Sequence, residues 1–291
     1  MTVRLAAAGW EAELRPEIGG ALSALRLDGI DVLRPMAHGA VDPLQSSCFP
    51  LVPYCNRIKA GAFAWQGEAV QLPRNFPPET SSLHGMGWQV PWQVVHADAF
   101  RCTLAHQHAG LGPRPWKSAP DTWPWAYVAQ QRVRLGPQGL KVTLDLTNLS
   151  NGPMPAGLGL HPYFRRSDET AVRFSSRGMV RVDESLIPAG DFVPAATFAD
   201  WAAGTPLPDV LVDHCFVDWG GKVEIVDAAG TIAMRATGAP DLHVYAPADG
   251  SALCFEPVSH TPDALNQAPA AMITLPPGCT ASLTMEISAS A

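Results

Sequence analysis

The chain has few charged residues, no cluster of Lys or Arg and no long hydrophobic run. Of its 291 residues, 16% are charged, and 27 acidic residues against 20 basic ones give a formal net charge of −7. A nucleic acid would require basic side chains in a row to neutralise its phosphates, so we expect no nucleic acid partner. Because no stretch reaches the roughly 18 apolar residues of a membrane span, we expect no membrane partner.

The N-terminus lacks the long apolar core of a signal peptide, since Glu11, Glu13 and Arg15 soon follow its few apolar residues. The six cysteines are scattered singly, without a CxxC pair or a dense framework. We therefore expect a cytoplasmic protein whose cysteines are reduced core thiols. They are Cys48, Cys55, Cys102, Cys215, Cys254 and Cys279.

Metal and nucleotide motifs are also missing. His106-Gln107-His108 and Asp213-His214-Cys215 contain ligand types but lack the spacing of a closed zinc site. Gly157-Leu158-Gly159-Leu160 precedes His161-Pro162, which does not open a helix as a nucleotide-binding glycine loop does. We predict no metal and no cofactor.

The dominant hydrophobic period is two, which is typical of strands with one solvated face. Apolar and polar residues alternate over 140–147 and again over 282–287. Residues 222–226 and 231–236 indicate two strands of a hairpin, and Asp28-Gly29 indicates another turn of this kind. No window of a dozen residues sustains a helical period between capping signals. The sequence therefore predicts an all-β fold, a large antiparallel β-sandwich with few short helices.

Proline and glycine do not divide the chain. The 28 prolines and 25 glycines are spread along its whole length and mark no single linker. At this length one domain or two tightly packed halves remain open.

Polar residues gather in three segments with apolar, Gly- and Pro-rich surroundings. The first comprises Asn56-Arg57-Ile58 with Ser82-Leu83-His84-Gly85-Met86-Gly87-Trp88, the second is Gly157-Leu158-Gly159-Leu160-His161-Pro162-Tyr163-Phe164, and the third is Cys254-Phe255-Glu256-Pro257. Together with Pro16-Glu17-Ile18-Gly19-Gly20, in this order and spacing, they make the chain resemble the aldose 1-epimerase (galactose mutarotase) family from about Gly9 to the C-terminus.

The resemblance implies a galactose mutarotase-like supersandwich, with residues 1–291 as one domain and a monosaccharide bound in a cleft on one sheet. It implies a mutarotase that interconverts the α and β anomers of a free aldose. Glu256 matches the base that takes the proton of the C1 hydroxyl. His161 matches the acid that protonates the ring oxygen.

Four further residues match substrate-binding positions of the family. His84 matches the second site histidine, and Arg57 a substrate-binding arginine, with Asn56 beside it in the same motif. Asp213 lies where the family has an aspartate that receives sugar hydroxyls, although Asp218 is close by in the sequence.

The sequence departs from the family pattern in two places. Met86 occupies a position usually held by glycine, and His260 adds a histidine near Glu256. Both bear on sugar preference. No motif supports His260 or His243, and we expect both to be structural.

Ring opening of a hemiacetal needs one group that removes a proton and another that donates one. A carboxylate and an imidazole do this near neutral pH, and their mutual attraction favours the charged pair. We expect a rate plateau around neutral pH, which falls on the acid side as Glu256 protonates and on the alkaline side as the imidazolium is lost.

Two other functions stay open. A mutarotase for hexose 6-phosphates would need a basic pocket, for which Arg74, Arg165 and Arg166 are candidates. A sugar-binding or sensing protein would keep the cleft without catalysis.

The loop 109–126 contains three tryptophans. One of Trp116, Trp123 and Trp125 could stack on a sugar, or all could seal a sheet edge. The preferred aldose, and whether the protein is a monomer or a homodimer, stay open.

Overall fold

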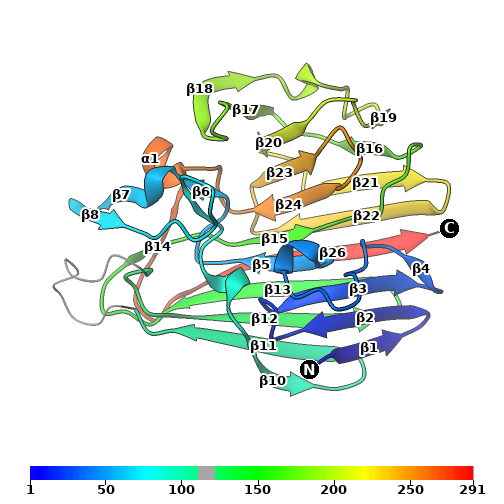
Figure 1. The fold of residues 1–291 in the computed structure, drawn as a ribbon, viewed down its shortest axis with the longest axis horizontal. Coiled ribbons are helices and arrows are strands. Elements are labelled where there is room, and N and C mark those ends of the chain that lie inside the picture. The colour runs from blue at the N-terminus through cyan, green and yellow to red at the C-terminus, as the bar shows by residue number, and fades with distance from the viewer. Residues whose placement is uncertain (111–121, 291) are drawn as a thin grey trace.

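Two large β-sheets pack face to face in the structure, a computed structural model that describes residues 1–110 and 122–290. Within these residues one sheet has 11 strands and the other has 9, and every strand pairing is antiparallel. Figure 1 looks through both layers, with the strands running across the view. The predicted all-β antiparallel sandwich is confirmed.

The 11-stranded sheet contains elements from both halves of the sequence. In spatial order its strands are β1 (Val3–Ala7), β2 (Trp10–Arg15), β3 (Ala21–Leu27), β5 (Cys48–Leu51), β15 (Gly159–Pro162), β24 (Cys254–Val258), β23 (Asp241–Ala246), β20 (Val212–Val217), β17 (Gly178–Val182) and β18 (Pro188–Val193), with β4 (Ile30–Asp31) paired to β3.

The 9-stranded sheet covers one face of the first. Its strands, in spatial order, are β10 (Gln93–Ala97), β11 (Arg101–His108), β12 (Tyr127–Gly136), β13 (Gly139–Asn148), β26 (Thr280–Ser290), β22 (Gly230–Thr237), β21 (Lys222–Asp227), β16 (Ala171–Phe174) and β19 (Thr205–Pro206).

Smaller elements gather mainly at one end of the sandwich, at the left of Figure 1. Three two-stranded sheets pair β6 (Arg57–Ile58) with β9 (Ser82–Leu83), β7 (Ala62–Trp65) with β8 (Glu68–Gln71), and β14 (Met154–Ala156) with β25 (Ile273–Leu275). The described helices are short, as predicted: α1 (Ala264–Gln267) and the 3₁₀ turns η1 (Pro43–Gln45), η2 (Lys59–Gly61), η3 (Gly87–Gln89), η5 (Ala195–Thr197) and η6 (Pro269–Ala271). None of them has the length and apolar composition that a membrane span requires.

The core lies between the sheets and follows the period of two. In β13 the alternation predicted over 140–147 buries Leu140, Val142 and Leu144 against the other layer. The predicted hairpin of β21 and β22 and the Asp28-Gly29 turn between β3 and β4 are also present. Alternate residues of the central strands of the 11-stranded sheet, such as Phe255 and Val244, join the same core. Their neighbours in sequence therefore project from the opposite face.

The six cysteines are all free thiols, and five of them are buried. The prediction of core thiols is confirmed for these five and wrong for Cys279, which is exposed in the turn that leads into β26. Burial raises the pKa of Cys102 to about 11, and those of Cys55, Cys215 and Cys254 well above the usual range. These buried thiols stay protonated.

Candidate active site

An open pocket of about 790 Å³ lies on the face of the 11-stranded sheet that points away from the other layer. This volume is in the range of small-molecule sites. Its floor comes from β15, β24, β23 and β20, and its wall from the segments around β6 and β9. The structure brings all six predicted site residues to this pocket: Asn56, Arg57, His84, His161, Asp213 and Glu256.

The floor of the pocket is a row of side chains across neighbouring strands. Phe49 of β5 pairs with His161 of β15, and Glu256 of β24 pairs with His243 of β23. β15 and β24 are neighbours through Gly159 and Val258, and the same register sets His161 beside Glu256. Directly opposite residues of antiparallel strands have Cβ atoms about 4.5–5.5 Å apart. The sheet register therefore brings together groups that are far apart in the sequence.

His161 and Glu256 are in direct contact. Nε2 of His161 lies 3.2 Å from Oε1 of Glu256, and the side chains are only 8% and 2% exposed. The imidazole packs against both Phe49 and Tyr163, with ring centroids 4.6 and 4.7 Å away. Oε2 of Glu256 has no hydrogen-bond partner among the described residues. The aromatic stack fixes the plane of the imidazole, and the carboxyl group keeps one oxygen uncommitted.

Burial decides where the proton of this pair resides. It raises the pKa of Glu256 to about 8, an effect that the positive charge of His243 partly offsets. Burial, followed by the positive charge of His243, lowers the pKa of His161 to about 3. At neutral pH the favoured state is thus a neutral carboxyl beside a neutral imidazole. The expectation that mutual attraction makes the charged pair the favoured state is wrong, because loss of solvation outweighs that attraction.

Asp213 and His243 form the second carboxylate–imidazole pair of the pocket. Nε2 of His243 donates to Oδ1 of Asp213 at 2.7 Å. Burial lowers the pKa of His243, but this hydrogen bond and the negative charge of Asp213 outweigh the effect of burial, so the pKa is raised. For Asp213 burial raises the pKa, and the hydrogen bond from His243 outweighs it, so the pKa is lowered. This pair favours the ionised state.

The side chain of His243, for which we expect a structural role from the sequence, lines the pocket. A signal was present in the sequence. In Asp241-Leu242-His243-Val244-Tyr245, polar residues alternate with apolar ones, which indicates a strand with His243 on its polar face. What the sequence did not reveal is that this face borders Glu256.

His84 presents one hydrogen-bond donor to the pocket. Its Nδ1 accepts a hydrogen bond from the backbone N–H of Asn56, so Nε2 carries the proton of the neutral ring. Burial lowers the pKa of His84 well below its usual value, followed by the effect of His161. Both His84 and Asn56 have positive φ angles, of 57° and 54°. These turns place the two side chains side by side at the wall.

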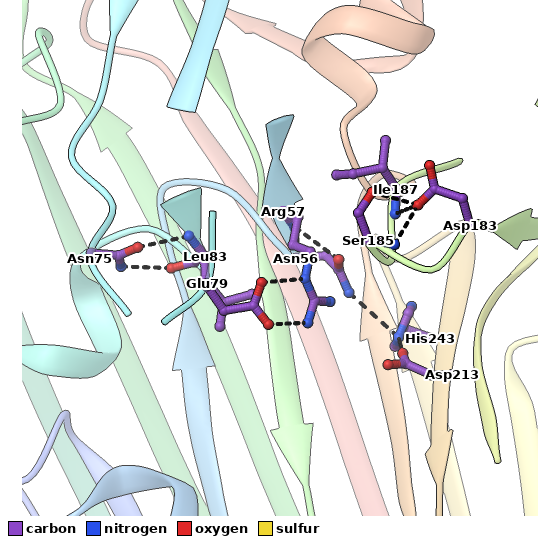
Figure 2. Close-up of polar contacts among 10 residues, drawn as sticks. All are labelled: Asn56, Arg57, Asn75, Glu79, Leu83, Asp183, Ser185, Ile187, Asp213 and His243. Atoms are coloured by element: carbon purple, nitrogen blue, oxygen red, sulfur yellow. Dashed lines mark hydrogen bonds and ion pairs between the residues drawn. The ribbon is translucent and has the colours of Figure 1, made fainter. Parts of the chain in front are cut away.

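The side chain of Asn56 links the wall to the floor. Its Oδ1 accepts the backbone N–H of Arg57, and its Nδ2 approaches Nε2 of His243 at 3.4 Å (Figure 2). Because the proton on Nε2 of His243 is directed to Asp213, the amide hydrogens of Asn56 stay available for a ligand.

Arg57 is held by a carboxylate at the pocket wall. Its Nη2 and Nε donate to the two oxygens of Glu79 at 2.9 and 3.3 Å, a two-bond arrangement visible in Figure 2. Such a pair fixes the plane of the guanidinium. The orientation of the N–H groups that do not bond to Glu79 is thereby fixed as well. Glu79 was not identified from the sequence, because it lies in a Pro-rich segment without a motif.

Arg34 is a second pocket residue that sequence reasoning missed. Its guanidinium lies 3.7 Å from the centroid of the Tyr163 ring, and Nη2 donates to the carbonyls of Leu44 and Ser46. It thereby extends the stack formed by Tyr163, His161 and Phe49. Among the described residues, no carboxylate forms an ion pair with Arg34.

One side of the pocket rim is the turn between β17 and β18. Oδ1 of Asp183 accepts hydrogen bonds from Ser185 and from the backbone N–H of Ile187, as Figure 2 shows. The turn holds Leu186 at a φ of 59° and presents it to the pocket.

The two departures from the family pattern lie outside the pocket. Met86 faces a separate, small hollow near Trp123. His260 is buried, accepts the backbone N–H of Cys55 at Nε2 and donates from Nδ1 to the carbonyl of Thr261. Its structural assignment agrees with these contacts. Neither residue is among those that line the pocket.

Other candidates also lie elsewhere. Trp123 and Trp125 are buried against Phe63 and each other, as expected of side chains that seal a sheet edge, while Trp116 lies outside the described residues. Asp218 is exposed and pairs with Arg177. Within residues 1–110 and 122–290, no cluster of three or more His, Cys, Asp or Glu side chains has the geometry of a metal site.

The basic residues considered for a phosphate site do not line the pocket. Arg165 forms a two-bond ion pair with Asp227, and Arg166 donates to the carbonyls of Pro247 and Ala252. Arg74 is exposed outside the lining.

Comparisons with known proteins agree with the resemblance. The profile of the family described as aldose 1-epimerase matches residues 2–288. The curated Escherichia coli K12 proteins YphB and YihR, both described as uncharacterized, are 32% identical over 257 residues and 25% identical over 276 residues. The first alignment covers 84% of this chain and 83% of YphB, and the second covers 91% of this chain and 86% of YihR.

Solved structures share the fold. A crystal structure of an Escherichia coli K12 protein proposed to be an aldose 1-epimerase superposes with a TM-score of 0.89 at 27% identity, over 100% of this chain and 99% of that one. A galactose mutarotase-like protein from Clostridium acetobutylicum gives 0.84 at 20% identity, over 99% and 94% of the two chains, and this likeness concerns the fold alone.

Proposed function

Because the chain belongs to the aldose 1-epimerase family, we propose that it is a mutarotase, which interconverts the α and β anomers of a free aldose by opening and reclosing the sugar ring. The observation that carries this proposal is the contact of 3.2 Å between Nε2 of His161 and Oε1 of Glu256 on the pocket floor. In a cyclic aldose O1 and O5 are both bonded to C1, so one anomeric centre can contact both groups.

The proton balance of the reaction matches this pair. In the reactive state Glu256 is a carboxylate and His161 an imidazolium. Glu256 takes the proton of O1, the C1–O5 bond breaks as C1=O1 forms, and His161 gives its proton to O5. After rotation about C1–C2, the reverse transfers close the ring on the other face. The pair carries one proton in total before and after each step.

The neutral form of the free pair is therefore one proton transfer away from the reactive form. The two heavy atoms are 3.2 Å apart, which allows that transfer to be direct. Hydroxyl groups of a bound sugar supply hydrogen bonds to the carboxyl of Glu256, which lines the pocket. Such bonds favour the ionised carboxylate and so prepare the pair for ring opening.

The remaining predicted residues orient the sugar. Nε2–H of His84, the amide of Asn56 and the guanidinium of Arg57 are donors, and Asp213 is an acceptor. A sugar hydroxyl both donates and accepts, so a wall with donors and an acceptor suits a monosaccharide. Positioned acid and base groups each contribute about 10²–10⁴-fold to the rate.

A hexose 6-phosphate mutarotase is the second candidate, with one observation in its favour. Arg165 and Arg166, proposed earlier for the phosphate, are engaged elsewhere. Arg34 lines the pocket as a cation without a carboxylate ion pair among the described residues, and could meet an anionic substituent. A sensing protein on the same fold would lack the exchange reaction altogether.

One set of measurements separates these functions. Exchange between the anomers of glucose, galactose, xylose and arabinose is followed by polarimetry or NMR, with glucose 6-phosphate in parallel. The proposal predicts acceleration of at least one free aldose by the wild type and a strongly reduced acceleration by Glu256→Gln. Preference for the phosphate would favour the second candidate. Full exchange in Glu256→Gln, or binding without exchange in the wild type, would overturn the proposed mechanism.

A further inference from the structure

His243 has no place in the two-residue proton exchange, yet it borders the catalytic carboxyl group. It pairs with Glu256 across β23 and β24, is 4% exposed and lines the pocket. Its hydrogen bond of 2.7 Å to Asp213 is one of the shortest contacts in the pocket. Nδ1 of His243 has no hydrogen-bond partner among the described residues. A proton on Nδ1, which makes the ring an imidazolium, is therefore stabilised only by neighbouring negative charge.

Charged and titratable groups surround His243 from every neighbouring element. On β20 Asp213 bonds to it and Cys215 is opposite in register, while His214 projects away and stacks on Phe198. The groups that face it from β24, β15 and the pocket wall are Glu256, His161, Arg57 and His84. Asp213 contributes a negative charge within hydrogen-bond distance, whereas the positive charge of Arg57, which is paired with Glu79, lowers the pKa of His243.

The order of the strands determines which group a charge on His243 affects most. β24 lies between β15 and β23, so Glu256 is directly beside His243 and His161 is one strand farther away. A positive charge on His243 thus stabilises a carboxylate on Glu256 more than it destabilises an imidazolium on His161.

From this arrangement we infer that His243, held as an imidazolium by Asp213, is a positioning residue that stabilises the carboxylate form of Glu256. The inference rests on the proposed function, since it gives His243 its role through the catalytic base. Asp213 then serves two purposes: it receives sugar hydroxyls and it keeps the proton on His243. The effect is largest in the reactive state, where Glu256 carries its negative charge.

The consequence is a defined pH range for the reaction. The His161–Glu256 pair must hold one proton, which it loses as the pH rises above the pKa of about 8 of Glu256. His243 opposes the effect of burial on that pKa. If His243 loses its positive charge, the negative charge of Asp213 is no longer balanced. The lost positive charge and the unbalanced negative charge both raise the pKa of Glu256, which then keeps its proton to higher pH.

His243→Gln tests this directly, because the amide can still donate to Asp213 but carries no charge. We expect kcat to fall at neutral pH and the alkaline limb of the pH–rate profile to move upward by roughly 1–3 units, the range typical of a removed neighbouring charge. His96→Gln is the matched control, since His96 forms an exposed pair with Asp98 on the other sheet. That variant should keep the wild-type profile. A uniform loss of rate in His243→Gln without movement of the limb would overturn the inference.

A measurement independent of turnover distinguishes this inference from the proposed function. In wild-type protein with isotope-labelled histidine, NMR should show His243 doubly protonated at pH 7. In protein with labelled glutamate, the carboxyl of Glu256 should titrate at higher pH in His243→Gln than in the wild type. A neutral His243 at pH 7, or an unchanged Glu256 titration, would refute the inference even if the enzyme proves active. If no aldose is exchanged but both titrations agree, only the proposed function fails.

Discussion

Two carboxylate–imidazole pairs lie on the same sheet face, and they hold their protons in opposite ways. Asp213 and His243 favour the ionised state, with the pKa of the acid lowered and that of the imidazole raised. Glu256 and His161 favour the neutral state, with pKa values of about 8 and about 3. The chemical partners are nearly the same, so their surroundings decide the difference.

Contact geometry and solvation explain the contrast. Asp213 accepts a hydrogen bond of 2.7 Å from His243 and keeps 11% of its side chain exposed. Glu256 is 2% exposed, its contact with His161 is 3.2 Å, and Oε2 has no partner among the described residues. A short hydrogen bond offsets the loss of water, whereas a long contact does not. The Asp213–His243 pair is thereby held in its ionised form, whereas the Glu256–His161 pair holds a proton that can move between its two groups.

The largest expected effect comes from breaking the neutral pair at Glu256. In Glu256→Gln the amide cannot accept the proton of O1, so kcat for anomer exchange should fall by about 10²–10⁴-fold. NMR exchange spectroscopy on the best aldose measures this. Glu286→Gln, on the exposed side of β26, is the matched control and should keep the wild-type rate. A Glu256→Gln rate within a factor of three of wild type would contradict the assignment.

A comparison of the Tm of Glu256→Gln with that of the wild type distinguishes a loss of catalysis from a loss of folding. A carboxyl whose pKa is raised in the folded chain contributes stability that is complete below the unfolded pKa and lost as the pH rises through about 8. Above pH 8 the folded wild type holds a poorly solvated carboxylate, which the amide replaces. Glu256→Gln should therefore match or exceed the wild-type Tm at pH 9.

Breaking the ionised pair at Asp213 should lower kcat less than the loss of Glu256 does, and should also weaken binding. Asp213→Asn removes a charged acceptor for sugar hydroxyls, and hydrogen bonds to charged groups contribute about 1.5–3 kcal/mol, so KM should rise roughly 10-fold or more. Deprotonation of His243 should also move to lower pH, which NMR of the labelled imidazole detects. An unchanged KM together with an unchanged His243 titration would show that Asp213 serves neither purpose.

The smallest effect is expected outside both pairs, at Glu79. Glu79→Gln loses the charge that orients Arg57 and keeps the shape of the side chain. KM should rise a few-fold at unchanged kcat, because an ion pair with partial exposure contributes about 0–1 kcal/mol. Steady-state kinetics with the preferred aldose suffice. A loss in kcat instead of KM would place Arg57 in the chemical step rather than in binding.

The sequence predicted the fold class and much of the pocket, for identifiable reasons. Alternation in β13 and β26 revealed strands with one buried face. The resemblance carried by the motifs around His84, His161 and Glu256 implied that these residues share one site, and all three line the pocket. Each motif alone says little about a site, and it was their order along the chain, matched to the family, that implied it.

What the sequence could not supply depends on strand order and packing. His243, Glu79 and Arg34 lie in segments without a motif, and their importance comes from which neighbours the sheet register and the chain path bring to them. The neutral state of His161 and Glu256 follows from their burial, which is a property of the packed sheet and not of either motif.

The pH dependence of anomer exchange in the wild type tests most directly the claim that a buried pair sharing one proton performs the reaction. With the preferred aldose and buffer-corrected rates, kcat should be constant from about pH 5 through neutrality and fall above about pH 8, as the pair loses its proton. A rate that keeps increasing from pH 5 to pH 9 would show that an ionised carboxylate acts alone, and would contradict the account.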